Sequence, residues 1–412
     1  MPTAEILSQG DEVVTGQTPD TNASWLADRL GSLGFDVVRH TVVGDRREDI
    51  IALMLEIAAR SDVCIGTGGL GPTDDDHTSS AAGEAFGHPL EFHEDTMQQI
   101  AAMFARFHRP MADINRKQAY LPATSTRLDN DWGTAPGFAI QHQRCWFAFL
   151  PGVPREMKAM FDARVLPHLV EQFALRPGRL VTLRCVGIGE SDMQMRAGQL
   201  EHPGLVWGTR TMLPENHLKL RFTADVPESE IRAFVDEIVG RIGPAVFAVE
   251  GLDADSGGTL AAVIGRRLVA LGQTLAVAES CTGGRVAAMC TAVPGASQWF
   301  TEGVVAYANI AKSRLLDVSE ALLAEHGAVS EPVARAMAEG LRANSGADYT
   351  LSVTGIAGPG GGTDAKPVGT VHIAVASPSG TSHRLLRLGG DRGRIQDLAA
   401  ASALDLVRRT IP

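Results

Sequence analysis

A short apolar segment that ends in a glycine-rich turn constrains this chain more than any other feature. Residues 274–278 are apolar enough to form a buried strand, and residues 279–284 follow with the sequence Glu-Ser-Cys-Thr-Gly-Gly. The pattern from Gly283 onward predicts a helix, which places Ser280 at a strand-to-helix turn. The first N–H groups of a helix have no partner within it, so they can hold a phosphate or an oxyanion that glycines allow to approach.

The same turn also has a purely structural interpretation. Ser280 or Thr282 would then cap the helix, and Gly283 and Gly284 would only close a tight turn. The thiol of Cys281, next to Ser280, is a rival nucleophile. The turn residues alone leave these alternatives open.

Two segments further along the chain favour catalysis. Tyr307–Lys312 contains a tyrosine and a lysine, and a glycine-rich loop occupies residues 353–362. A serine hydroxyl is a weak nucleophile until a base takes its proton, and a lysine is that base if burial lowers its pKa from roughly 10.4. Neither short motif contains a histidine, so a Ser280–Lys312 dyad is favoured over a Ser-His-Asp triad. Taken singly, Lys312 also fits a solvated surface position.

Composition sets broad limits on the class of protein. The chain has 412 residues, of which 44% are apolar and 21% charged, as expected of two or three globular domains. Its net charge of -11 is not that of a general nucleic-acid binder, so we expect no direct contact with nucleic acid. Five scattered cysteines without C-x-x-C spacing favour reduced thiols over disulfides or a zinc site.

The sequence also predicts a cellular location. The chain begins without a basic, apolar leader, and no run approaches the ~18 apolar residues of a membrane span. We therefore expect a cytoplasmic protein that does not contact membranes.

Strand and helix signals predict a mixed α/β chain of three domains. Residues 1–168 read as a doubly wound α/β domain, residues 169–254 as a small α+β unit, and residues 255–412 as a second α/β domain. Predicted strands lie at 4–7, 36–43, 62–67, 180–186, 206–211, 217–223, 245–249 and 274–278, and predicted helices at 22–33, 47–59 and 228–242.

Three consecutive aspartates follow a glycine-rich loop in the first domain. The strand at 62–67 runs into Gly-Gly-Leu-Gly-Pro-Thr and then into Asp74, Asp75 and Asp76. Adjacent carboxylates repel one another unless they are solvated, hydrogen-bonded or bound to a cation. A divalent metal held there would bridge to phosphate oxygens and favour phosphoanhydride cleavage. Asx-turns and a helix cap are the structural alternative.

Other polar residues are candidates for the same crevice. Ligands bind beyond the carboxyl ends of the strands in doubly wound sheets, where Asp11 and Asp45 are expected. Lys117, Gln118 and Glu156 are further candidates for phosphate or metal contacts.

On three sets of motifs the chain resembles the competence/damage-inducible CinA family over nearly its whole length. In the first domain the motifs are Gly10-Asp-Glu-Val and Gly68-Gly-Leu-Gly-Pro-Thr with Asp75, Asp76 and Thr78. In the last domain they are Glu279-Ser-Cys-Thr-Gly-Gly284, Tyr307–Lys312, Gly327-Ala-Val-Ser330 and Thr354-Gly-Ile-Ala-Gly-Pro359.

The resemblance implies a molybdopterin-binding-like first domain, a KH-like middle domain, a three-layer α/β/α last domain and a homodimer. It implies two activities on small nucleotides. The last domain would deamidate nicotinamide mononucleotide without a cofactor. The first would cleave ADP-ribose with a divalent metal such as Mg, Mn or Co.

The resemblance also implies a role for each matched residue. Ser280 would be the nucleophile, Lys312 its base and Tyr307 a further catalytic residue, with the oxyanion resting on N–H groups beside Gly283. Asp75 and Asp76 would bind the metal. The expected substrate-binding residues are Thr282, Gly283, Gly284, Thr354, Gly355, Asp45, Gly69, Gly71, Lys117 and Glu156.

Two functions of other classes remain open at this stage. One is a non-catalytic module that binds a pterin or nucleotide at the acidic loop. The other is an interaction protein in DNA uptake, against which the net charge argues as far as direct DNA contact is concerned.

Overall fold

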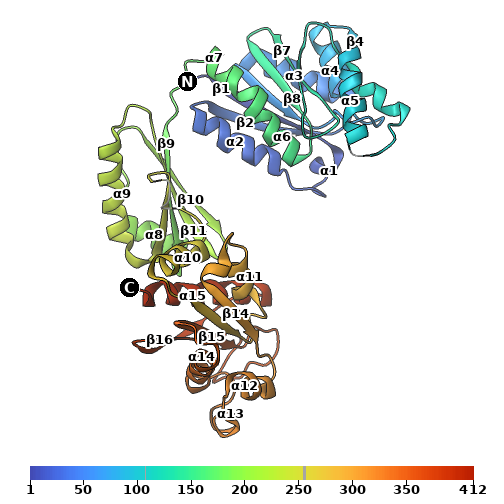
Figure 1. Ribbon diagram of the computed structural model, residues 1–412. Coiled ribbons are helices and arrows are strands. Elements are labelled where there is room, and N and C mark those ends of the chain that lie inside the picture. Colours follow the sequence, from blue (N-terminus) through green and yellow to red (C-terminus); the bar gives the residue numbers. More distant parts are fainter. Residues whose placement is uncertain (107, 254–256) are drawn as a thin grey trace. The chain divides into compact units, whose positions relative to one another are not determined.

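The protein, described here by a computed structural model, forms two compact units, Met1–Gly178 and Arg179–Pro412 (Figure 1). The structure describes residues 1–106, 108–253 and 257–412. The predicted domain boundary between residues 254 and 255 lies outside the described residues. Among the described helices, none has both the length and the apolar character that a membrane crossing requires.

Unit 1 is built on a six-stranded sheet in the order β2-β1-β3-β8-β7-β6. Its parallel strands are β1 (Thr3–Gln9), β2 (Asp36–Val43), β3 (Val63–Thr67) and β8 (Cys145–Leu150). β7 (Gly137–His142) and β6 (Thr126–Leu128) run antiparallel at one edge. A small hairpin sheet pairs β4 (Leu90–Phe92) with β5 (Tyr120–Pro122).

Both faces of this sheet are buried under helices. Successive side chains of a strand point to opposite faces, so Ile6 and Ile65 pack in one core and Leu7 and Cys64 in another. The helices are α1 (Asp11–Val14), α2 (Thr21–Leu33), α3 (Arg47–Arg60), α4 (Thr78–Phe86), α5 (Glu94–Arg106), η1 (Asp113–Ala119), α6 (Pro154–Met160), η2 (Phe161–Val165) and α7 (Leu166–Gln172). The result is the doubly wound arrangement that the sequence predicts.

Unit 2 begins with an antiparallel sheet in the order β10-β11-β9-β12. Its elements are β9 (Arg179–Val186), α8 (Glu190–Ala197), β10 (Leu205–Met212), β11 (Glu215–Phe222), α9 (Glu228–Ile242), η3 (Gly243–Ala245) and β12 (Val246–Glu250). Alternate residues of β11, such as Leu218 and Leu220, pack in one core with Met193 of α8 and Ile231 of α9. This part is therefore a small two-layer α+β fold.

The rest of unit 2 is a five-stranded sheet in the order β14-β13-β15-β16-β17. Its strands are β13 (Leu275–Glu279), β14 (Phe300–Val305), β15 (Tyr349–Gly355), β16 (Thr370–Ser377) and β17 (Gly380–Arg387). Its helices are α10 (Leu260–Leu271), α11 (Arg285–Thr291), η4 (Ala296–Gln298), α12 (Asn309–Leu316), α13 (Glu320–His326), α14 (Glu331–Ser345) and α15 (Arg392–Thr410).

The two faces of β13 show why three layers form. Leu275 and Val277 pack in the core that contains residues of α10, α11 and α15, while Ala276 and Ala278 pack in the core of α12, α13 and α14. A strand that is covered on both faces has a continuous apolar sequence, and this pattern predicted the strand from the sequence. The parallel strands β13 and β15 both end beside the glycine-rich turns.

Two helix-interior glycines provide a test of this packing. A Cβ at Gly340 in α14 would overlap the Leu316 carbonyl oxygen at the end of α12, whereas a Cβ at Gly240 in α9 meets nothing. Alanine in a helix is ordinarily more stable than glycine by roughly 0.5–1 kcal/mol. We expect Gly240→Ala to raise the midpoint of thermal unfolding and Gly340→Ala to lower it. Equal shifts would contradict the close contact between α12 and α14.

Candidate active site

A buried carboxylate fixes the turn between β13 and α11. Glu279, the last residue of β13, is 1% exposed, and its carboxylate accepts hydrogen bonds from three main-chain N–H groups. The donors are Gly284 at 3.0 Å, Val286 at 3.1 Å and Ala287 at 2.8 Å. A negative charge is favourable at a helix N-terminus, so Glu279 joins the end of the strand to the start of the helix.

This arrangement differs from the expectation that N–H groups beside Gly283 hold an oxyanion. The Gly284 N–H donates to Glu279, and the Gly283 N–H donates to the Ser280 carbonyl at 3.2 Å. Both glycines have positive φ angles, 62° at Gly283 and 98° at Gly284, which other residues rarely adopt. The glycines are therefore required by the backbone of the turn, and neither is among the residues that line the adjacent cavity.

Ser280 and Lys312 meet in the interior of the C-terminal domain. Lys312 lies in α12 and is 1% exposed, and its Nζ is 3.1 Å from Ser280 Oγ. The same Nζ donates to the carbonyl oxygens of Ala306 at 2.9 Å and Tyr307 at 3.2 Å. The predicted dyad thus has hydrogen-bonding geometry, and the solvated alternative for Lys312 is wrong.

The three neighbours of Lys312 Nζ are oxygens, which suit an ammonium that donates to all three and also the uncharged amine that a base requires. A neutral amine has two N–H donors and one lone pair; the two carbonyls accept the donors, and the lone pair is left for the Ser280 hydroxyl. Burial lowers the pKa of Lys312 from 10.5, because removing an ammonium from water disfavours its charge. Cys281 lies next to the site, but burial raises the pKa of its thiol to about 12, which disfavours the thiolate required of a nucleophile.

A cavity of about 260 Å³ opens beside Ser280 and Lys312. Thr354 and Gly355, at the end of β15, line it as predicted. Thr282 is fully buried and is not among the lining residues. The cavity is lined by Ser280, Cys281, Tyr307, Asn309, Lys312, Ala328, Val329, Thr354, Gly355, Ile356, Ala357, Gly358, Gly360, Gly361 and Arg392.

Arg392 is a cavity residue that the sequence analysis missed. Its guanidinium donates to the Gly358 carbonyl at 2.7 Å and to the Tyr307 hydroxyl at 3.1 Å. Tyr307 itself is 61% exposed, so its side chain lies at the rim of the cavity rather than against Ser280. No short motif marks Arg392, because it stands at the start of α15, far along the chain from the other site residues.

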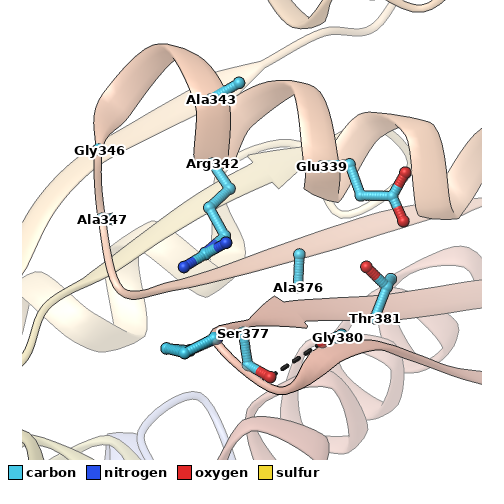
Figure 2. Close-up of a pocket in the computed structure, with 10 residues that line it drawn as sticks. Glu339, Arg342, Ala343, Gly346, Ala347, Ala376, Ser377, Gly380 and Thr381 are labelled. Carbon is cyan, nitrogen blue, oxygen red and sulfur yellow. Dashed lines mark hydrogen bonds between the residues drawn. The ribbon is translucent and has the colours of Figure 1, made fainter.

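A larger cavity of about 520 Å³ lies between α14 and the turn from β16 to β17 (Figure 2). Two of its polar side chains are engaged in the fold: Ser377 Oγ donates to the Gly380 carbonyl at 2.9 Å, and Arg342 Nε donates to the Asp348 carbonyl at 3.2 Å. No lining residue pairs a nucleophile with a base in the way Ser280 pairs with Lys312. The smaller cavity is therefore the better candidate for catalysis.

Unit 1 has its own cavity of about 270 Å³ beyond the end of β3. Of the residues predicted to bind substrate or metal, Gly69, Gly71, Asp76, Lys117 and Gln118 line it. Lys117 Nζ also donates to the Thr73 carbonyl, and the Asp76 carboxylate accepts from the Thr73 N–H at 2.8 Å. These bonds fold the glycine-aspartate loop against η1.

The other residues predicted for this site lie outside the cavity lining. Asp45 accepts from Gln9 Nε2 and from the Asp11 N–H, both at 3.0 Å, so it joins the ends of β1 and β2. Glu156 accepts from Asn130 Nδ2 at 2.8 Å. Asp75 is exposed, and hydrogen bonding from Thr73 lowers the pKa of its carboxyl group.

The acidic loop fits a metal ion shared with a ligand better than one enclosed by protein. Among residues 1–106, 108–253 and 257–412, no three His, Cys, Asp or Glu side chains are grouped to hold a metal ion. Mg²⁺ is commonly held by one or two carboxylates together with substrate phosphates, a donor set that Asp75 and Asp76 can provide.

Two family descriptions match the chain. "CinA C-terminal domain" matches residues 258–411, and "Probable molybdopterin binding domain" matches residues 5–171. The segment between the two matches contains the antiparallel sheet of unit 2.

Named relatives cover nearly the whole chain. A CinA-like protein of Anaeromyxobacter sp. (strain K) is 45% identical over 98% of both chains. A putative competence-damage inducible protein of Symbiobacterium thermophilum is 44% identical, again over 98% of both. Among solved structures, a CinA superfamily protein from Escherichia coli is 34% identical, covering 36% of this chain and 88% of its own, with a TM-score of 0.36.

Proposed function

This chain belongs to the CinA family, and we propose that its C-terminal domain hydrolyses a primary carboxamide, that of nicotinamide mononucleotide, to the carboxylate and ammonia. The observation that carries the proposal is the 3.1 Å contact between Lys312 Nζ and Ser280 Oγ at the wall of a cavity. A buried amine that has lost its proton is a base, and a hydroxyl beside it becomes a nucleophile.

In the first half of the reaction, Ser280 Oγ bonds to the carbonyl carbon while its proton passes to Lys312 Nζ. The carbonyl oxygen becomes an oxyanion, for which the proposal assigns the main-chain N–H of Cys281, the residue after the nucleophile. Lys312 then gives the proton to the leaving nitrogen as the C–N bond breaks. Ammonia leaves, and the acyl group remains on Ser280.

In the second half, a water molecule attacks the acyl carbon and transfers a proton to Lys312. The ester bond to Ser280 breaks, Lys312 returns the proton to Ser280 Oγ, and the product leaves as a carboxylic acid that gives its remaining proton to solvent to become the carboxylate. Arg392, a permanent cation at the cavity, is suited to the substrate phosphate. Its contact with Tyr307 places that residue at the binding rim in this proposal.

Replacing Ser280 by alanine tests the nucleophile. We expect Ser280→Ala to reduce ammonia release from nicotinamide mononucleotide by at least ~10³-fold, because the attacking atom is lost. Ser377→Ala, which removes a hydroxyl from the larger cavity, is the matched control and should leave the rate unchanged. Wild-type turnover by Ser280→Ala would refute the mechanism.

The pH dependence of deamidation tests the base. Lys312 accepts a proton only when neutral, so kcat/KM should rise with pH and level off above its pKa. Because burial lowers that pKa, we expect the midpoint below 10.5. Lys312→Arg, which keeps a positive charge but cannot act as a base, should be inactive at every pH. A midpoint at or above 10.5 would contradict a buried neutral amine.

We further propose that unit 1 cleaves the diphosphate of ADP-ribose to AMP and ribose 5-phosphate. The proposal is supported by one cavity that joins the glycine loop, Asp76 and Lys117. The Lys117 ammonium would offset diphosphate charge, and the glycines would let the phosphates approach the main chain. A divalent metal held by Asp75 and Asp76 would polarise the phosphoryl oxygens.

Removing the metal should separate the two activities. We expect EDTA to abolish ADP-ribose cleavage and to spare deamidation, because only ADP-ribose cleavage relies on carboxylates that bind a cation. The double substitution Asp75→Ala with Asp76→Ala should have the same selective effect, whereas Asp74→Ala is the matched control. Unchanged ADP-ribose turnover in the double variant would remove the proposed site.

A further inference from the structure

Gln118 lines the cavity of unit 1 and carries a buried hydrogen-bond acceptor without a partner among the described residues. The residue lies in η1, is 6% exposed and lines the cavity. Its Nε2 donates to the Leu70 carbonyl at 3.2 Å, which fixes the orientation of the amide. Within the described part of the chain, its Oε1 has no hydrogen-bond partner. Buried acceptors are rarely left unpaired, so this oxygen points to a donor that the ligand supplies.

The cavity walls indicate the kind of group that carries the donor. Leu70, Leu121 and Pro136 line the cavity together with the ring of Tyr120, so part of its wall is apolar. A planar heteroaromatic ring fits such walls, and a hydrogen-bond donor at its edge can reach an oxygen among them. Lys117 and the glycine loop at the same cavity suit a phosphate attached to the ring's sugar or side chain.

We propose that Gln118 Oε1 accepts a hydrogen bond from an exocyclic amino group of a heteroaromatic ligand. Gln118 is then a specificity residue that selects an aminated ring over its oxo counterpart, whose carbonyl oxygen would face Oε1. The inference rests on the proposed nucleotide site of unit 1. Adenine and pterin rings both carry such an amino group, and the experiment below distinguishes between these two ligands.

Two ligand pairs on the unmodified full-length protein test the proposal. Equilibrium binding in EDTA compares AMP with inosine monophosphate, and a pterin monophosphate with the lumazine analogue that carries oxygen in place of the amino group. We expect the aminated member of one pair to bind at least ~10-fold more tightly, because the oxo member leaves Oε1 unpaired. The pair whose two members differ in affinity shows which ring the cavity binds.

Variants assign the discrimination to Gln118. Gln118→Met, which removes the acceptor with little change of shape, should equalise the two members of the discriminating pair. Gln141→Met, at the exposed end of β7, is the matched control and should leave the preference unchanged. If Gln118→Met does not fold, the ligand pairs on the unmodified protein still decide the question.

Equal affinities within both pairs, or no binding of any of the four ligands, would overturn the proposal. A separate assay of ADP-ribose cleavage with metal present distinguishes this failure from that of the proposed function. If the protein cleaves ADP-ribose but binds both members of each ligand pair equally in EDTA, the proposed pyrophosphatase activity stands and Gln118 does not select the ligand.

Discussion

The candidate active site depends on the bonds between the Glu279 carboxylate and the first turn of α11. Three N–H groups converge on that carboxylate, so the end of β13 and the start of the helix form one rigid corner. Ser280 lies inside the corner, and its own N–H donates to the Val353 carbonyl of the neighbouring strand at 2.9 Å. The Ser280 hydroxyl is therefore held from two directions at the place where Lys312 Nζ reaches it.

The two halves of the chain use glycine-rich strand ends in different ways. In the C-terminal domain the glycines permit a backbone conformation, and the polar chemistry comes from side chains brought in by α12 and α15. In unit 1 the loop is folded against η1 through Thr73, and the glycines themselves line the cavity. The same local pattern therefore holds the Ser280 hydroxyl beside Lys312 in the C-terminal domain and forms part of the cavity wall in unit 1.

Much of the fold could be predicted from periodicity alone. The strand at 36–43 and the helix at 228–242 have the predicted bounds, and the remaining predicted elements differ by few residues. The elements without a prediction range from the short, polar α8 to the apolar, fully buried strand β8 and the 19-residue helix α15. Site residues that lie in short motifs, such as Ser280 and Lys312, were predicted. Arg392 was missed because it lies in no such motif and reaches the cavity only through the packing of α15.

By itself the sequence determined the alternation of strands and helices, the turn that carries Ser280, and a family whose members share these motifs, because such properties depend on neighbouring residues. Only the tertiary structure decided which amine is buried beside the Ser280 hydroxyl, which N–H groups are engaged by Glu279, and which acceptor of Gln118 has no partner among the described residues. Burial and hydrogen bonding at these atoms arise from residues far apart along the chain. Local sequence patterns therefore do not predict the burial or the hydrogen bonds of these atoms.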